Sequence, residues 1–228
     1  FNLKKGYGLT EATAGTTLSD DYSNRLGSIG IPLVCNDFKV VKPGTDEELG
    51  YYEKGEFCIS GPTVMKCYYN NEEETKKAID SDGYFHSGDV GYMDKDGYIF
   101  ITGRSKNVIV TQNGKNIYPE EIEMLLDKIE EIKEVMVYGK KPEKNSKREE
   151  KELIITARVI PDFNKIKEKY GEKTKEEIHE IIWKKIKEEN KKLESFKAVK
   201  KLEIKEGEFE KSSTMKIKRY KELEKDCD

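Results

Sequence analysis

Residues 84–110 read YFHSGDVGYMDKDGYIFITGRSKNVIV, and this stretch decides how the chain is divided. It contains two strand-like segments, GDVGYMD at 88–94 and GYIFITG at 97–103, joined by the turn sequence DKDG. An Asp-Gly pair between two apolar segments is a strong signal for a β-hairpin. The stretch therefore predicts a hairpin with Asp89 near its start and Arg104 directly after its end.

The composition of the chain changes immediately after this hairpin. Residues 1–103 hold 14 of the 18 glycines, with 10 Lys+Arg and 17 Asp+Glu, a net charge of −7. Residues 104–228 hold the other 4 glycines, with 32 Lys+Arg and 28 Asp+Glu, a net charge of +4. We therefore expect two domains, 1–104 and 105–228, joined by a hinge.

Short strands and glycine-rich turns characterise the first domain. DFKVVKP at 37–43 and GEFCISG at 55–61 have the composition of strands. One short helix, NEEETKKAI, is expected between strands, with Asn71 as its cap. The fold class predicted for the whole chain is α+β, beginning with a small antiparallel, β-barrel-like subdomain.

Helices and strands alternate in the second domain, which reads as a small α+β unit. A helix is expected from Pro119 over PEEIEMLLDKIEEI, and a longer one carries an isoleucine stripe at 178, 181, 182 and 186. Strands are expected at 134–139, 152–160 and 199–205. The charged run KKPEKNSKREEK between the first two of these strands is expected to be an exposed loop.

Composition and spacing exclude several classes of protein. Charged residues make up 38% of the chain, no apolar run could span a bilayer, and no signal segment opens it, so we expect a cytoplasmic protein. Lysines interleaved with glutamates argue against nucleic acid as a partner. The cysteines form no CxxC pair and there are only two histidines, which argues against structural zinc. Cys35, Cys58 and Cys67 are expected to be buried thiols.

The segment GYGLTEATAG at 6–15 is a candidate ligand-binding turn. Its glycines allow the backbone to approach a ligand, and Tyr7, Thr10 and Glu11 supply a ring, a hydroxyl and a carboxylate. Taken alone, the segment is equally consistent with an ordinary glycine-rich junction between a strand and a turn.

Five blocks of the chain, taken together, resemble the adenylate-forming enzymes: acyl-CoA synthetases, luciferases and peptide-synthetase adenylation domains. The blocks, in order, are GYGLTEATAG, GEFCISGPTVMKCYY, YFHSGDVGYMDKDGYIFITGRSKNVI, NGKNIYPEEIE and STMKIKR. The resemblance implies that the chain is the C-terminal portion of a longer enzyme. The missing N-terminal part would contain the phosphate loop and most of the acyl pocket.

The resemblance implies roles for residues of the first domain. Asp89 would accept hydrogen bonds from the ribose hydroxyls of AMP or ATP, and Arg104 would donate to the same sugar. The alternative is that these two residues only pair with each other. Tyr7 and Gly8 would lie beside the nucleotide, Thr10 would reach a phosphate oxygen, and Glu11 would hold Mg²⁺.

The second domain carries the remaining implied roles. Lys106 would be the hinge, and Gly114 would line the approach of the thiol, although a plain turn also explains that glycine. Lys216 would be the catalytic lysine that bridges the acyl carboxylate and the α-phosphate. Met215 stands where the family often has glycine, and Glu210 where it often has proline, so the assignment could shift to Lys218.

The function that the resemblance implies is ATP-dependent activation of a carboxylic acid, followed by transfer to CoA, with Mg²⁺ as a further requirement. The ending EFEKSSTMKIKRY is similar to long-chain fatty acid CoA ligases. Two alternatives remain open: an enzyme that loads a carrier protein, and a non-catalytic nucleotide-binding module. We expect this chain by itself to be inactive.

Overall fold

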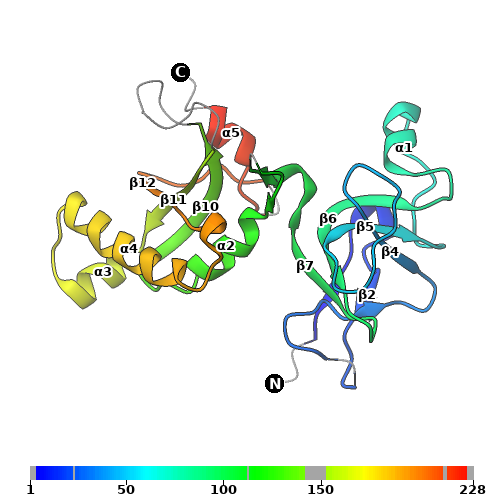
Figure 1. The fold of residues 1–228 in the computed structure, drawn as a ribbon, viewed down its shortest axis with the longest axis horizontal. Helices are drawn as coiled ribbons and strands as arrows, with labels where there is room; N and C mark the ends of the chain where they lie inside the picture. The colour runs from blue at the N-terminus through cyan, green and yellow to red at the C-terminus, as the bar shows by residue number, and fades with distance from the viewer. Residues whose placement is uncertain (1–3, 23, 112, 142–152, 213–214, 225–228) are drawn as a thin grey trace. The chain divides into compact units, whose positions relative to one another are not determined.

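The computed structural model describes residues 4–22, 24–111, 113–141, 153–212 and 215–224. Contacts along the chain divide it into two units, residues 1–106 and residues 107–228, called here the first and second unit. The structure is α+β, as the sequence predicts, with antiparallel pairing in the first unit and one parallel strand pair in the second (Figure 1). No helix in the described part of the chain is both long and apolar enough to cross a membrane.

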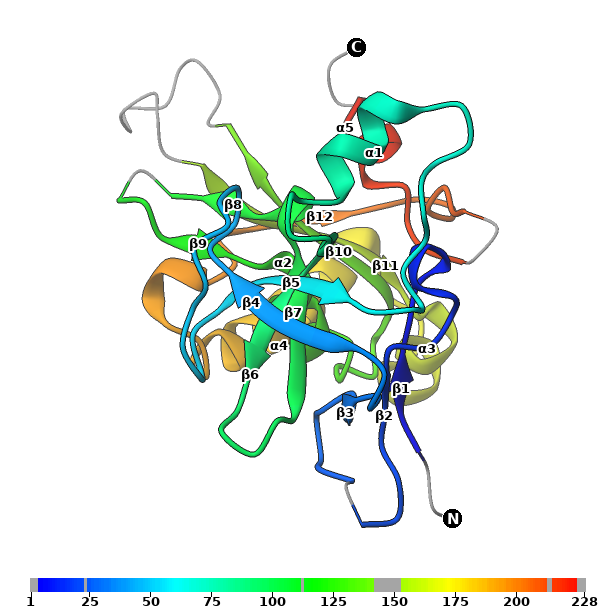
Figure 2. The ribbon, with the colours of Figure 1, turned by 90° about the vertical axis from the view of Figure 1, so that its right-hand side faces the viewer.

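The main sheet of the first unit has four antiparallel strands in the order β4-β5-β6-β7, which lie side by side in Figure 2. The strands are β4 (Asp37–Val41), β5 (Gly55–Ser60), β6 (Phe85–Met93) and β7 (Ile99–Arg104). The order leaves β4 and β7 at the edges of this sheet. The described residues therefore form no closed barrel, which corrects the barrel-like part of the sequence-based prediction.

The hairpin between β6 and β7 forms where the sequence predicts it. Its turn is closed by the Asp94 carboxylate, which accepts hydrogen bonds from the backbone N–H groups of Asp96 (3.0 Å) and Tyr98 (2.9 Å). Asp89 and Arg104 are then partners in the strand register. The hairpin thus brings these two residues together.

The remaining elements of the first unit are short. A second sheet has the order β1-β2-β3, with β1 (Gly6–Tyr7), β2 (Thr17–Leu18) and β3 (Ile31–Pro32). The helical elements are η1 (Thr10–Ala12), α1 (Glu72–Ala78) and η2 (Ser105–Asn107). Asn71 caps α1 as predicted, because its side chain accepts a hydrogen bond from the Glu74 N–H at 3.2 Å.

The second unit is built on a three-stranded sheet of order β10-β11-β12. Its strands are β10 (Ile132–Lys140), β11 (Ile154–Pro161) and β12 (Lys201–Ile204), and β8 (Ile109–Val110) pairs separately with β9 (Asn116–Ile117). The helical elements are α2 (Pro119–Leu126), α3 (Phe163–Tyr170), α4 (Lys175–Asn190), η3 (Ser195–Lys197) and α5 (Arg219–Glu224). Most of the charged loop predicted at 140–151 lies outside the described residues.

The two faces of β10 enter two different cores, because successive side chains of a strand point to opposite sides. Val135 and Val137 belong to the core formed with α2 and α4, which Figure 1 shows on one side of the sheet. Met136 and Tyr138 belong to a smaller core with Phe209, against which Ile217 packs. The C-terminal tail is thereby fixed to the other face of the sheet.

Two of the three cysteine predictions are wrong. Only Cys58 is buried, on β5, and burial raises the pKa of its thiol to about 12. Cys35 and Cys67 are exposed because each lies in a loop and not within a strand. Cys227 lies outside the described residues.

A network of buried charge joins β10, β11 and β12. The Glu203 carboxylate accepts hydrogen bonds from Tyr138 Oη (2.6 Å), Lys140 Nζ (2.7 Å) and Arg158 Nη2 (2.9 Å). Burial alone would raise the pKa of this carboxyl, but the hydrogen bonds from Lys140, Tyr138 and Arg158 outweigh it and hold the pKa at about 2. The ionised form of Glu203 is therefore favoured by the fold.

We predict that Glu203→Gln lowers the free energy of unfolding of the second unit by about 1–3 kcal/mol at pH 7. Because the folded-state pKa lies below the unfolded value of 4.5, this stabilisation is complete above about pH 4.5 and is lost as the pH falls toward 2. Urea unfolding at pH 7 and at pH 3, followed by fluorescence of the single tryptophan, measures both effects.

The matched control is Glu208→Gln, because Glu208 is 80% exposed and its nearest cation, Lys133, is 3.9 Å away. Its effect is expected to stay within about 0.5 kcal/mol. Equal effects of the two substitutions at pH 7 would contradict the stabilising role of the network.

Candidate functional site

A buried carboxylate, that of Asp89, is the centre of the candidate site in the first unit. Gly88 precedes it with φ +71°, a left-handed conformation that glycine adopts without strain. The Asp89 side chain is only 9% exposed. Burial of a carboxylate at this depth is costly unless polar or charged partners compensate for the lost water.

Two side chains from different strands contact this carboxylate. Tyr7 Oη, from β1, donates a hydrogen bond to Oδ2 at 2.6 Å, and Arg104, from β7, forms an ion pair in which its Nε lies 2.9 Å from Oδ1. Burial of the phenol, together with the neighbouring Asp89, raises the pKa of Tyr7 above its ordinary value. The phenol therefore stays protonated and keeps its donor.

The two carboxylate oxygens are engaged without being saturated, since an ionised carboxylate offers about four lone-pair positions. Each oxygen of Asp89 can accept a second donor, and the Arg104 side chain is 54% exposed. The ion pair between Asp89 and Arg104, which the sequence analysis named as the alternative to ribose binding, is thus present. It leaves acceptor capacity on Asp89 for two adjacent hydroxyl groups. This chemistry fits a ribose.

The segment GYGLTEATAG at 6–15, which contains Tyr7, folds into a tight loop. A Cβ at Gly8 would lie 1.7 Å from the backbone oxygen of Ala14, so only glycine fits there. Thr13 and Ala14 both have positive φ, at 53° and 66°. The structural reason for Gly8 is therefore the close approach of the chain to itself, whereas the sequence suggested approach to a ligand.

Glu11 is held by the loop that follows β5. Its Oε1 accepts a hydrogen bond from Tyr68 Oη at 3.1 Å, and its backbone oxygen accepts from the Met65 N–H at 2.7 Å. Thr10, the residue before it in η1, is exposed. A half-buried carboxylate beside an exposed hydroxyl supplies the oxygen ligands that Mg²⁺ prefers.

Lys106 and Gly114 lie in short, exposed segments. Lys106 is exposed in η2, at the last position of the first unit. Gly114, in the second unit, has φ +71° in the turn between β8 and β9, where its N–H donates to Thr111 O at 2.9 Å. The turn by itself accounts for this glycine, and the open space around it would accept a Cβ.

Lys216 lies in the described part of a hairpin-like tail. An isolated bridge pairs Lys211 with Ile217, and the Ser212 N–H donates to Lys216 O at 2.8 Å. The Lys216 side chain is exposed and has no ion-pair partner among the residues that the structure describes. Lys218 Nζ, in contrast, lies 3.7 Å from Glu210 Oε1.

Met215 has φ +63°, which explains why a glycine would suit this position. The departure from the family pattern therefore keeps the backbone shape that glycine would provide, at the cost of local strain. The turn places Lys216 directly after the strained residue, in the exposed part of the tail.

Sequence reasoning did not identify the groups that hold these residues in place. The Arg219 guanidinium, three residues after Lys216, donates to both Glu123 oxygens (2.7 and 2.6 Å) and to Val137 O (2.8 Å). Glu56 accepts from the Gly88 N–H at 2.8 Å. The sequence did offer a signal for Glu56, because an acidic residue stands out within the apolar strand β5. It offered no signal for the pairing of Arg219 with Glu123 of α2.

Comparison with known proteins finds relatives of this chain among the AMP-binding enzymes. Residues 1–69 match the family model described as AMP-binding enzyme. The chain is related to the adenylate-forming enzymes. It is 44% identical over 137 residues to a probable 4-coumarate–CoA ligase of Dictyostelium discoideum, and 42% identical over 138 residues to a long-chain-fatty-acid–CoA ligase of Bacillus subtilis.

Solved structures of adenylate-forming enzymes have a similar fold. ATP-bound MatB from Rhodopseudomonas palustris has a TM-score of 0.78 and 26% identity, and the match covers 99% of this chain and 41% of that one. The sequence matches cover 60% of this chain and 25% and 24% of the two ligases. The matched region therefore spans about a quarter of the length of these curated relatives.

Proposed function

We propose that this chain is the C-terminal portion of an AMP-forming acyl-CoA synthetase that acts in the cytoplasm. The observation that carries the proposal is the buried Asp89 carboxylate, which is held by Tyr7 and Arg104 and retains acceptor capacity for a ribose diol. The relationship to CoA ligases supplies the reaction class. The reacting acid would be a long-chain fatty acid.

Within this proposal, each first-unit residue has a chemical task. Asp89 would accept from the two ribose hydroxyls, and Arg104 would donate to the same sugar. Tyr7 and Gly8 would lie beside the nucleotide, and Thr10 would donate to a phosphate oxygen. Glu11 would hold Mg²⁺, which neutralises the charge that gathers on the phosphates.

The second unit would supply a cation for one half of the reaction. The exposed ammonium of Lys216 suits a group that contacts the acyl carboxylate and the α-phosphate during adenylation and then departs. Arg219 and Glu123 fix the base of the tail, and backbone hydrogen bonds to Ser212 hold the backbone of Lys216, so that its side chain extends from a held segment. Lys106 would act as the hinge, and Gly114 would line the path of CoA.

We predict that Asp89→Asn in the full-length enzyme weakens AMP binding about 10- to 100-fold, because a neutral amide replaces a charge-assisted acceptor and presents a donor to one hydroxyl. Isothermal titration with AMP measures this. The control is Asp96→Asn on the same hairpin, where the carboxylate is 51% exposed and pairs with Arg25. Similar losses in both variants would remove Asp89 from the nucleotide site.

We predict that Lys216→Ala slows acyl-adenylate formation by about 10²-fold or more, and changes thioester formation from supplied acyl-adenylate by less than about threefold. Pyrophosphate exchange and single-turnover transfer to CoA measure the two halves. Lys218→Ala is the matched control, because that lysine lies near Glu210. Equal losses in the two half-reactions of Lys216→Ala would contradict a transient role.

The acceptor and the acid are tested by one assay of the full-length enzyme with ATP and Mg²⁺. We expect acyl-CoA from palmitate and CoA, and a kcat/KM for palmitate at least about tenfold above that for 4-coumarate. If pyrophosphate exchange occurs without acyl-CoA formation, and a carrier protein is acylated instead, the acceptor is the carrier protein and not CoA. Absence of any exchange would favour a non-catalytic nucleotide-binding module.

A further inference from the structure

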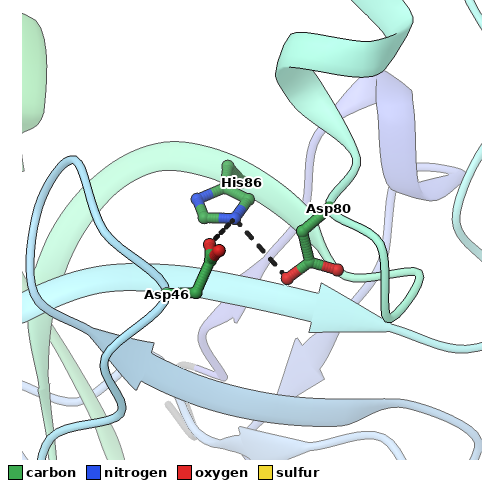
Figure 3. A group of neighbouring side chains, drawn as sticks. All are labelled: Asp46, Asp80 and His86. Carbon is green, nitrogen blue, oxygen red and sulfur yellow. Dashed lines mark ion pairs between the residues drawn. The ribbon is translucent and has the colours of Figure 1, made fainter.

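A second cluster of polar side chains lies in the first unit and has no part in the proposed function. Figure 3 shows its three members converging: His86 on β6, Asp46 in the turn between β4 and β5, and Asp80 shortly after α1. His86 Nε2 lies 3.6 Å from Asp46 Oδ1 and 3.7 Å from Asp80 Oδ2. One nitrogen and two oxygens thus lie within 4.8 Å of one another.

We propose that His86, Asp46 and Asp80 bind a divalent transition-metal ion of the Zn²⁺ type through these three atoms. The two N···O separations exceed the range of a normal hydrogen bond. Two ligands that each lie about 2.0–2.1 Å from a tetrahedral ion are about 3.3–3.4 Å apart. The two separations from His86 Nε2 are therefore a few tenths of an ångström longer than in a coordinated site, and the two carboxylate oxygens lie within 4.8 Å of each other.

The imidazole is oriented for this role by the groups at its other nitrogen. His86 Nδ1 lies 3.4 Å from Cys58 Sγ and 3.6 Å from Glu56 Oε2. A metal-ligating imidazole usually has a hydrogen-bonding partner at its other nitrogen, and here Cys58 Sγ is within hydrogen-bond range of Nδ1, which would hold the hydrogen on Nδ1 in the metal-bound form. The lone pair of Nε2 then points toward Asp46 and Asp80.

Asp80 is fixed with one oxygen directed at the site. Its Oδ1 accepts hydrogen bonds from the backbone N–H groups of Asp82 (3.0 Å) and Tyr84 (2.8 Å). Its Oδ2 accepts from Lys39 Nζ at 3.1 Å and has a second lone pair for an ion. The side chain is 8% exposed, so Asp80 is the rigid ligand.

The charges of the cluster favour a cation. Asp46, Asp80 and Glu56 contribute three negative charges, which Lys39 only partly balances. Asp46 is 75% exposed on its turn, so this side provides an entry path and leaves the remaining coordination position to water. Sequence spacing could not detect this site, because its ligands come from three separate segments and two of them are aspartates.

Isothermal titration of the chain with Zn²⁺ at pH 7.5 tests the proposal, in a background where Cys35, Cys67 and Cys227 are replaced by serine so that these thiols do not bind the ion. We expect one equivalent of Zn²⁺ to bind, and His86→Ala to abolish binding. The matched control is His179→Ala, which removes the only other histidine and should leave binding unchanged. Circular dichroism checks that each variant is folded.

Asp46→Asn keeps the proposal testable if His86→Ala does not fold, because Asp46 is exposed on a turn. We expect this variant to bind at least about tenfold more weakly. The imidazole NMR signals of the two histidines provide an independent readout, in which Co²⁺ should broaden those of His86 first. Absence of binding up to about 1 mM Zn²⁺, or binding that survives His86→Ala, would overturn the proposal.

Discussion

The hydrogen bond and the ion pair made by the buried Asp89 carboxylate are the interactions on which the candidate site depends. They join β1, β6 and β7 through Tyr7 and Arg104, so that segments more than eighty residues apart meet at one charge. An isolated carboxylate at this depth would be costly, and these two partners compensate for its burial. Both partners leave lone pairs on the carboxylate oxygens, which in the proposed function a sugar would use.

Much of the local structure could be predicted from the sequence. The β6–β7 hairpin follows from its Asp-Gly turn, and α1 begins after its predicted Asn71 cap. α2 begins at Pro119 as predicted, but it ends at Leu126 because the chain then turns to bury Ile129 in the core. These features are encoded by neighbours in the chain, which is why a pattern reveals them.

The features that sequence reasoning missed are short or depend on distant partners. The strands of the β1-β2-β3 sheet have two residues each, too few for an alternating pattern. α3 has only eight residues; Asp162 caps it by accepting a hydrogen bond from the Lys165 N–H at 3.2 Å, and Ile166 is its buried residue. The Arg219–Glu123 pair spans 96 positions of the chain, so no local signal announces it.

In the proposed function each unit contributes one charged group, the Asp89 carboxylate from the first unit and the Lys216 ammonium from the second. Asp89 is buried inside the first unit and contacted by two side chains, whereas the Lys216 side chain is exposed on a tail whose backbone is held by Ser212 and Arg219. A fixed acceptor suits a sugar that stays bound through both half-reactions, and an exposed ammonium suits a contact made in only one of them.

The most direct test of this account is a crystal structure of the full-length enzyme with AMP. The account predicts that both ribose hydroxyls donate to the Asp89 carboxylate within about 3 Å, with the Tyr7 and Arg104 contacts retained or shared. AMP bound at a position where its ribose does not contact Asp89 or Arg104 would contradict the central claim.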